Sequence, residues 1–301
     1  MDRFWSDYVQ TSEELYSNRA LRFREDNSSL WLSAMKLTDG MAVLEVGCGG
    51  GIFCHRIKTA LPRCTITGLD RDGGHIAFAR RKTEELGLDC SFVQGDALAL
   101  PFPDNTFDAV TSHTVIEHVE TGSFLREQLR VLKPGGVISV LSVRTRLNVN
   151  PENWLPEDPE EVALLRKAWE PSRDLDKQNG VAQYEKKTEC EFPLALEQVG
   201  FINVNVDFFS VTNYAPDNAS CPRELALRQI NDNRLGALAS VEKALRRAPG
   251  ALTDAERERL LLLINNRYDR RVVLYERGEK LWDIATSTIM AITGVKPDSP
   301  E

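Results

Sequence analysis

The residues best suited to chemistry begin with the stretch VLEVGCGGG, Val43–Gly51, where four glycines follow an apolar run that contains one carboxylate, Glu45. Glycines in a turn let the backbone approach a ligand closely, and a helix N-terminus behind them presents free N–H groups. A G-x-G-x-x-G dinucleotide fingerprint would need glycine at position 52, which is Ile52. Because Glu45 would repel a pyrophosphate, it indicates either a cationic amino-acid group or a carboxylate held by the N–H groups of the loop. The alternative is a plain tight turn with a surface glutamate.

Further polar residues stand at the ends of other apolar runs. Asp70 ends TITGLD, Asp96 ends CSFVQGD, and Ser112 and His113 follow FDAVT, with His118 a few residues later. Acids and histidines in such positions can accept hydrogen bonds from a ligand or move a proton. These residues can form one site only if the fold brings the ends of the apolar runs close together.

The alternation of predicted strands and helices indicates a fold that brings these ends together. Short runs rich in Val, Ile and Phe read as strands, and the segments between them carry apolar residues at helical spacing with Gly or Pro-Gly stops. This alternation predicts a parallel sheet with helices on both faces, whose ligands bind in one crevice beyond the carboxyl ends of the strands. The predicted strands are 41–47, 65–70, 90–96, 107–112 and 135–143, and the predicted helices are 51–61, 73–87 and 123–136.

Four of these stretches together resemble a known family. VLEVGCGGG, the GLD that ends at Asp70, GDALALPFPDNTFDAVTS and VIEHVETGSFLREQLRVLKPGG are similar, in order and spacing, to the motifs of class I S-adenosylmethionine-dependent methyltransferases of the methyltransferase type 11-like kind. The resemblance covers about residues 41–143. It implies an α/β fold with a Rossmann-like seven-stranded sheet, mostly parallel with the last strand antiparallel, and S-adenosylmethionine as the cofactor.

The resemblance assigns the glycine loop to the amino-acid end of that cofactor. Gly47, Cys48 and Gly49 would line its methionyl part, with Gly51 in the same loop. Glu45 would lie near the ammonium group or brace the loop.

The resemblance assigns the next two turns to the nucleoside. Asp70, followed by Arg71, would accept hydrogen bonds from both ribose hydroxyls. Asp96 would accept from the adenine amine while the N–H of Ala97 meets a ring nitrogen. The alternatives are a helix N-cap for Asp70, a role that Asp72 could fill instead, and an ordinary turn aspartate for Asp96.

The histidines supply the candidate base. Ser112 and His113 would lie beside the methionyl chain and the sulfonium, and His113 and His118 are the candidate catalytic residues if the acceptor is a hydroxyl. The rate would then rise with pH through a pKa near ~6.5. For His118 a structural role is the alternative, and His55 and His75 are expected to be packed or solvated.

Composition limits the partners. The 301 residues carry a net charge of −8 without a basic stripe, which argues against a nucleic-acid partner. Neither the histidines nor the six cysteines have metal-ligand spacing, and the scattered cysteines suit buried free thiols of a reducing compartment. The charged N-terminus and the absence of a long apolar run predict a cytoplasmic protein without a membrane partner.

The remaining chain predicts helical additions to the core. We expect either a lid over the acceptor or an accessory bundle that could serve as a homodimer surface. The predicted organisation is an N-terminal helical segment (1–40), the cofactor-binding core (41–146), a helical insert (147–190), a core helix and strand (191–214), a second helical insert (215–280), and the last core strand with a tail (281–301).

These features predict an S-adenosylmethionine-dependent methyltransferase, of the EC 2.1.1 class, acting on a small molecule by in-line displacement. A protein or nucleic-acid methyltransferase and a non-catalytic S-adenosylmethionine-binding module remain alternatives. A nicotinamide oxidoreductase is disfavoured by Ile52.

Overall fold

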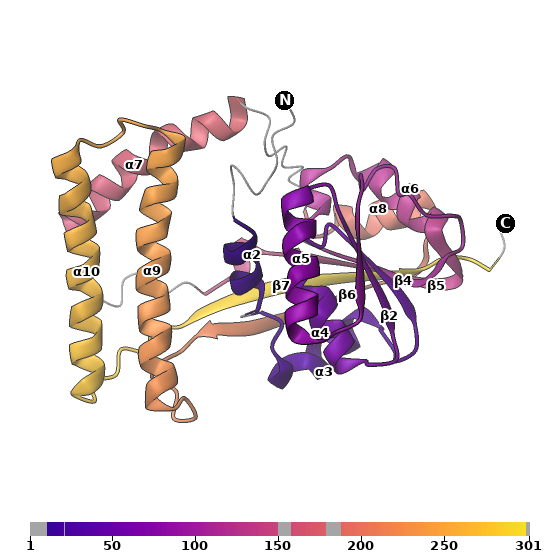
Figure 1. Ribbon diagram of the computed structural model, residues 1–301, viewed down its shortest axis with the longest axis horizontal. Helices are drawn as coiled ribbons and strands as arrows, with labels where there is room; N and C mark the ends of the chain where they lie inside the picture. The colour runs from indigo at the N-terminus through magenta and orange to yellow at the C-terminus, as the bar shows by residue number, and fades with distance from the viewer. Residues whose placement is uncertain (1–10, 21, 150–157, 179–187, 299–301) are drawn as a thin grey trace. The chain divides into compact units, whose positions relative to one another are not determined.

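The computed structural model describes residues 11–20, 22–149, 158–178 and 188–298, with no side chains for 172–178. The beginning of the predicted N-terminal segment and part of the first predicted insert therefore lie outside the described residues. The chain forms two compact units (Figure 1). The first comprises residues 1–147, 183–211 and 287–301, and the second comprises residues 148–182 and 212–286.

The first unit is built on a seven-stranded sheet with strand order β3-β2-β1-β4-β5-β7-β6. β1 to β5 are parallel wherever they pair, and β7 runs antiparallel to β5. This confirms the predicted Rossmann-like sheet with an antiparallel last strand. The strands are β1 Ala42–Val46, β2 Thr65–Asp70, β3 Cys90–Gln94, β4 Phe107–His113, β5 Leu132–Val143, β6 Ile202–Tyr214 and β7 Ala285–Val295.

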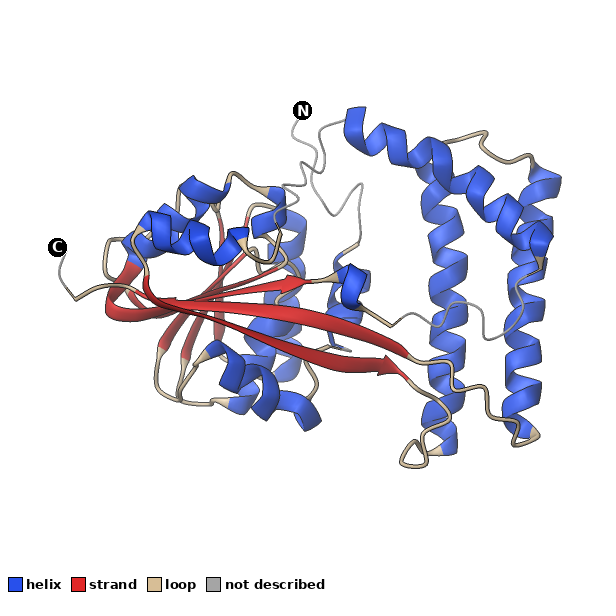
Figure 2. Cartoon of the chain, turned by 180° about the vertical axis from the view of Figure 1, so that it is seen from behind, coloured by secondary structure: helices blue, strands red, loops and turns tan. Residues whose placement is uncertain are grey.

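Helices cover both faces of this sheet (Figure 2). One core cluster packs α3, α4 and α5 against the strands through residues such as Trp31, Phe53 and Ile76. The other packs α6 and α8 through Phe124 and Phe192. The helices of this unit are α2 Ser12–Ala20, α3 Ser28–Met35, α4 Ile52–Ala60, α5 Gly73–Leu86, α6 Thr121–Val131 and α8 Glu191–Val199, with single 3-10 turns η1 Glu25–Asn27, η2 Ile116–His118 and η3 Thr145–Leu147.

One predicted turn is wrong. LKPGG, expected as the stop of the helical pattern over 123–136, belongs to β5, and α6 ends at Val131. Pro134 cannot donate the backbone hydrogen bond that would continue a helix. The N–H of Gly135 instead donates to the carbonyl of Lys296, 2.9 Å away.

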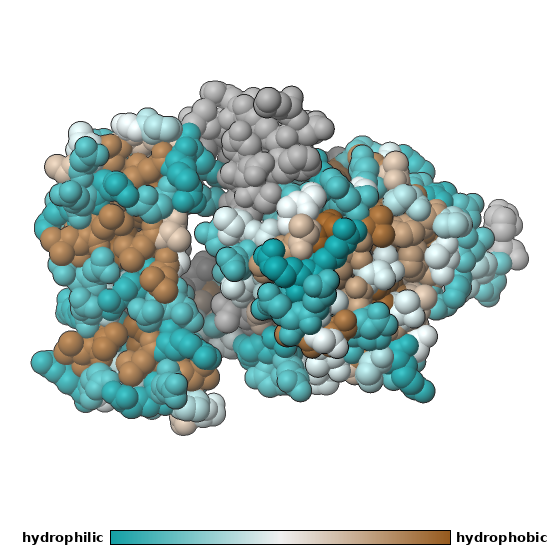
Figure 3. Space-filling view, in the orientation of Figure 1, coloured by the Kyte–Doolittle hydropathy of each residue, from teal (hydrophilic) through white to brown (hydrophobic). Residues whose placement is uncertain are grey.

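The second unit is helical. α7 Pro159–Gln178, α9 Arg223–Arg247 and α10 Asp254–Glu276 share a core that includes Ala168, Val241 and Leu260. Asp158 caps the start of α7, since its Oδ1 accepts from the N–H of Glu160 at 2.9 Å. Apolar patches reach the surface of this unit (Figure 3). Such patches commonly mark interaction surfaces.

A buried ion cluster ties the two ends of this unit's chain to α10. Arg271 is only 1% exposed and donates to Asp217 at 2.8 Å and to Asp283 at 2.7 and 2.8 Å. Tyr214, at the end of β6, donates its hydroxyl to Asp283 at 2.8 Å. The segments that enter and leave the helices are therefore fixed to one arginine, and removing it would leave two buried carboxylates unpaired.

All six cysteines are free thiols. Cys48, Cys54 and Cys64 are buried, but Cys190 is exposed, so the expectation of buried thiols is wrong for that residue. Along the described residues, no helix is both long and apolar enough to cross a bilayer.

Candidate functional site

The glycine loop and Asp70 form one hydrogen-bonded unit. The N–H of Gly49 donates to Asp70 Oδ2 at 2.8 Å, and the N–H of Asp72 donates to Asp70 Oδ1 at 2.9 Å. Asp72 itself caps α5 by accepting from the N–H groups of Gly74 and His75. The N-cap alternative for Asp70 is therefore wrong. Each Asp70 oxygen accepts one backbone hydrogen bond and keeps capacity for another, at the carboxyl end of β2.

The loop needs its glycines. Gly47 has φ 74° and Gly51 has φ 81°, in the left-handed region that favours glycine. A Cβ on Gly47 would lie 2.4 Å from Val115, and one on Gly51 would lie 2.8 Å from Phe92. The loop after β1 therefore packs directly against the segment that follows β4, as the shared crevice requires.

Glu45 is buried beneath this loop, at 2% exposure. Its Oε2 accepts a hydrogen bond from the thiol of Cys54 at 2.9 Å, whereas the loop N–H of Gly49 is committed to Asp70. Burial raises the pKa of Glu45 to about 8; the negative charge of Asp70 adds to the shift, and Cys54 and Arg19 oppose it. The site can therefore accept a positive group next to Glu45 at a gain in electrostatic energy.

Replacing Glu45 with Gln should stabilise the ligand-free protein as the pH rises. Between about 4.5 and 8 the unfolded chain releases the Glu45 proton while the folded chain retains it, so wild-type stability falls across that window. Gln resembles the protonated side chain and removes this loss. We expect the variant to gain at least ~1 kcal/mol over wild type between pH 5 and 8, measured by urea unfolding. Parallel stability curves would contradict this account of Glu45.

The segment after β3 carries Asp96 and Ala97. Asp96 is exposed, and its Oδ1 accepts from the N–H of Leu98 at 2.9 Å. It is thus a turn aspartate, and its Oδ2 accepts no hydrogen bond from the residues that the structure describes. Arg71 is exposed on the neighbouring turn, where its carbonyl accepts from Gln94 at 3.1 Å.

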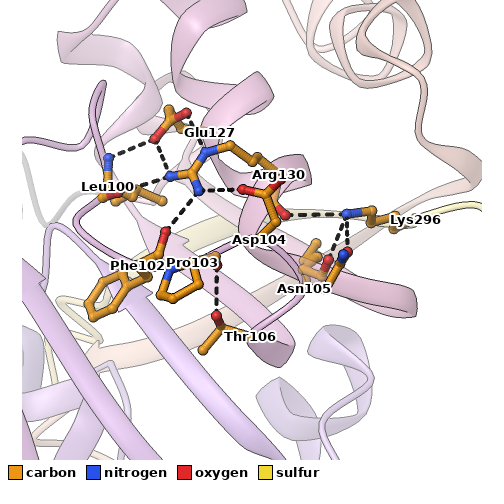
Figure 4. A network of polar contacts seen from close by, with 10 residues as sticks. Leu100, Phe102, Pro103, Asp104, Asn105, Thr106, Glu127, Arg130 and Lys296 are labelled. Carbon is orange, nitrogen blue, oxygen red and sulfur yellow. Dashed lines mark hydrogen bonds and ion pairs between the residues drawn. The ribbon is translucent and has the colours of Figure 1, made fainter.

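Arg130 of α6 holds this segment in place (Figure 4). Its guanidinium donates to the carbonyls of Leu100 and Phe102 and to the carboxylates of Asp104 and Glu127, at 2.8 to 2.9 Å. Glu127 in turn accepts from the N–H of Leu100 at 2.7 Å. The loop that follows Asp96 and Ala97 is therefore positioned by a side chain that the motifs alone do not single out.

Ser112 and His113 do not lie together. Successive side chains of a strand point to opposite faces, and the two neighbouring β4 residues follow this rule. His113 is buried with Phe23, ring centroids 4.8 Å apart and edge to face, whereas Ser112 is fully buried and its hydroxyl has no hydrogen-bond partner among the described residues. Burial holds the pKa of His113 well below its usual range, and Arg19 and Arg22 lower it further.

His118 and Glu117 lie on the turn η2 after β4. Burial, with Arg19 and Arg71, lowers the pKa of His118 to about 4, so its ring is neutral near pH 7. Glu117 accepts from the hydroxyl of Ser142, and burial raises its pKa. Glu117 stands between the two candidate histidines, but no sequence motif marks it as a site residue.

The sequence motifs do not single out two further residues near this turn, Thr114 and Arg19. Thr114 directly follows β4 with φ 54°, a conformation that is costly for a β-branched residue and often marks a functional turn. Its hydroxyl accepts from Arg19 of α2 at 3.1 Å. The signal in the sequence is weak, because nothing in SEELYSNRA indicates which strand α2 will cover.

His55 and His75 are packed, as expected. His55 Nε2 lies 2.7 Å from Thr83 Oγ1, whose own proton goes to the carbonyl of Ala79. Nε2 must then carry the proton, which leaves Nδ1 to accept from the Tyr16 hydroxyl at 3.2 Å. Both histidines therefore hold α2 onto the core, since His75 Nδ1 is also within 2.8 Å of Ser12 Oγ.

A pocket at the amino ends of the strands is separate from this site. Over the described ranges, no three His, Cys, Asp or Glu side chains are grouped to hold a metal. A pocket of about 440 Å³ is lined by residues such as Asp39, Met41, Asp108 and Lys133. These residues lie where β1, β4 and β5 begin, whereas the candidate site lies where the parallel strands end.

The family comparison matches the same part of the chain. Residues 44–140 match the model of the methyltransferase domain. This span contains the glycine loop, Asp70, Asp96 and the turn that carries His113 and His118.

Curated relatives match over a similar stretch. The fatty-acid O-methyltransferase of Mycolicibacterium smegmatis is 44% identical over 116 residues, which is 37% of this chain and 40% of that protein. The ubiquinone biosynthesis O-methyltransferase of Pseudomonas putida is 34% identical over 154 residues, 50% of this chain and 61% of that protein. The matches thus span about two to three fifths of the length of these relatives.

A solved structure extends the likeness to the fold of the chain. Phosphoethanolamine N-methyltransferase 2 of Haemonchus contortus, determined with S-adenosyl-L-methionine, superposes with a TM-score of 0.53 at 15% identity, covering 97% of this chain and 59% of that one. At that identity the likeness concerns fold alone. The matched domain, the motifs and the sheet order agree, and residues 44–140 form a methyltransferase domain of the class I S-adenosylmethionine-dependent kind.

Proposed function

We propose that this protein transfers a methyl group from S-adenosylmethionine to a small-molecule acceptor. The observation that carries the proposal is the arrangement around Asp70, which links the glycine loop after β1 to the end of β2 through the N–H groups of Gly49 and Asp72. A carboxylate held in this way faces the crevice with free acceptor capacity, which suits a pair of ribose hydroxyls.

The other residues fit the same cofactor. Glu45 suits an ammonium group, because it is buried and the Cys54 thiol is its only side-chain donor among the described residues. Gly47, Cys48, Gly49 and Gly51 would line the methionyl part, and Ser112 would lie near it. Arg71, Asp96 and Ala97 would contact the nucleoside.

The relatives favour a small acceptor. Their names refer to a fatty acid and to ubiquinone biosynthesis, and both are called O-methyltransferases. We therefore propose an oxygen nucleophile on a small organic molecule. A protein or nucleic-acid acceptor and a non-catalytic binding module remain the alternatives, and the net charge of −8 disfavours nucleic acid.

Methyl transfer depends mainly on how the protein positions the acceptor relative to the methyl group. Bound S-adenosylmethionine supplies an electrophilic methyl group with a good leaving group behind it. The protein must hold the acceptor in line with that bond at about 3 to 3.5 Å and remove the acceptor's proton. Of the two candidate bases we favour His118, because it is only partly buried and neutral near pH 7, whereas His113 packs against Phe23.

The helical unit is proposed to act as a lid over the acceptor. Lids that close on substrate exclude water and often limit turnover. Hydrogen exchange in residues 158–178 and 212–286 should slow when cofactor and acceptor are both present. Slowing confined to Gly47–Gly51 would instead favour an accessory bundle or a homodimer surface.

A cytoplasmic location is also part of the proposal. The six free cysteines support it, because reducing compartments keep thiols unpaired.

The proposal is tested by a transfer screen with methyl-labelled S-adenosylmethionine. Fatty acids, catechols and other phenols, amines, a protein mixture and RNA are offered separately. Label should pass to at least one small molecule and to neither macromolecule. Transfer to protein or RNA alone would contradict the small-molecule assignment.

A further inference from the structure

The helix α2 lies against the cofactor loop with one face inward. Ser12, Leu15, Tyr16 and Arg19 recur at i, i+3, i+4 and i+7, the spacing of a single helix face. Ser12 and Tyr16 contact the ring nitrogens of His75 and His55 on α5 and α4, so the helix is fixed to the core at two points. The remaining two residues of the face, Leu15 and Arg19, are directed elsewhere.

Leu15 covers the glycine loop. A Cβ added to Gly49 would lie 2.6 Å from Leu15 Cδ2, and one on Gly50 would lie 3.2 Å from the carbonyl of Ser12. α2 is therefore part of the wall around the methionyl end of the proposed cofactor site. The next turn of the same face brings Arg19 to the end of β4.

Arg19 is a partly buried cation with no counter-ion among the residues that the structure describes. Its one described hydrogen bond is to Thr114 Oγ1 at 3.1 Å, and no carboxylate in the described part of the chain lies within ion-pair distance of it. Burial, together with the charge of Arg22, lowers its pKa to about 9, although Glu117 and Glu45 oppose the shift. A guanidinium withdrawn from water is costly unless an anion pairs with it.

We propose that Arg19 binds the carboxylate at the amino-acid end of S-adenosylmethionine, so that α2 is part of the cofactor site. The inference rests on the proposed function. The carboxylate and ammonium of an amino acid are attached to one carbon, so their protein partners must be neighbours. Arg19 and Glu45 meet this requirement, because Arg19 donates to Thr114 at the end of β4, β4 pairs with the strand that carries Glu45, and Leu15 of the same helix face covers the loop that follows that strand. Planar guanidinium also suits bidentate binding of a carboxylate.

An acidic acceptor is the other source of a carboxylate, and the placement of Arg19 favours the cofactor. Thr114 follows β4 directly, and β4 pairs with β1 in a register that sets Thr111 beside Glu45. Arg22, three residues beyond Arg19, donates instead to Ser287 at 3.3 Å. Arg22 therefore provides a matched control on the same stretch of chain.

The test is calorimetric titration with S-adenosylmethionine and with decarboxylated S-adenosylmethionine, which keeps the ammonium, sulfonium and adenosine but lacks the carboxylate. Wild type should prefer the intact cofactor. Arg19→Met should weaken its binding roughly 10- to 100-fold while changing the affinity for the decarboxylated compound less than about 3-fold. Arg22→Met should change neither affinity by more than about 3-fold, and Arg19→Lys should recover part of the preference. Thermal melting checks that the variants fold.

Several outcomes would overturn the inference. Equal weakening of both ligands would make Arg19 a support for α2 rather than a carboxylate partner, and unchanged affinity for both would remove it from the site. Unchanged cofactor affinity with lost methylation of oleate would assign the carboxylate to the acceptor. If Arg19→Met does not fold, Arg19→Gln takes its place, and a variant that keeps the full wild-type preference for the intact cofactor would overturn the inference. Wild type that binds neither ligand would overturn the proposed function itself, which distinguishes the two failures.

Discussion

Replacing His118 with Ala is expected to lower kcat roughly 10²- to 10⁴-fold with an oxygen acceptor, while the affinity for S-adenosylmethionine changes little. The neutral imidazole would take the acceptor's proton as the new bond forms. His113→Ala is the matched comparison, and it should reduce stability through lost packing against Phe23 more than it reduces kcat.

The pH profile sharpens this prediction. Only the neutral ring accepts a proton, and the pKa of His118 is about 4, not the usual ~6.5. The wild-type rate should therefore be level between pH 6 and 8 and fall only in more acidic solution, which corrects the sequence-based expectation. Equal rates for wild type and both variants would remove histidine from the mechanism. Glu117, with its raised pKa, would then be the next candidate.

Asp70→Ala is expected to weaken binding of S-adenosylmethionine by about 1.5 to 3 kcal/mol, or roughly 10- to 150-fold. The substitution removes the carboxylate proposed for the ribose hydroxyls and also frees the N–H of Gly49. Calorimetric titration measures the loss directly.

Asp72→Ala is the control for Asp70. It removes the N-cap of α5 and should cost about 0.5 to 2 kcal/mol of stability, with a much smaller effect on cofactor affinity. Equal losses of affinity in the two variants would mean that Asp70 acts through the fold of the turn and not through the cofactor.

Local patterns were sufficient to predict most of the fold. β2 begins and ends where TITGLD predicts, and the T-x-x-E spacing of Thr253 and Glu256 is enough to indicate the capping box that starts α10. These features depend on residues within a few positions of one another. The start of β5 could not be predicted from local sequence, because LKPGG joins the strand through a hydrogen bond to the chain just after the distant strand β7.

The candidate site was predictable only in part. The turns after the parallel strands could be placed in one crevice from topology, and Asp70 does lie beside the glycine loop. Strand alternation alone already implied that Ser112 and His113 face opposite sides of the sheet, a signal that the motif comparison obscured. The donor to Glu45 proved to be the Cys54 thiol, and Arg19 reaches the site from a helix whose docking depends on His55 and His75. Contacts between residues so far apart in sequence cannot be read from local spacing.

The most direct test of the central claim is calorimetric titration of the wild-type protein with S-adenosylmethionine, with a nicotinamide dinucleotide titrated in parallel. The crevice formed by the glycine loop, Glu45 and Asp70 predicts saturable binding of one S-adenosylmethionine per chain and no binding of the dinucleotide. Absence of S-adenosylmethionine binding, or saturable binding of the dinucleotide in its place, would contradict the account.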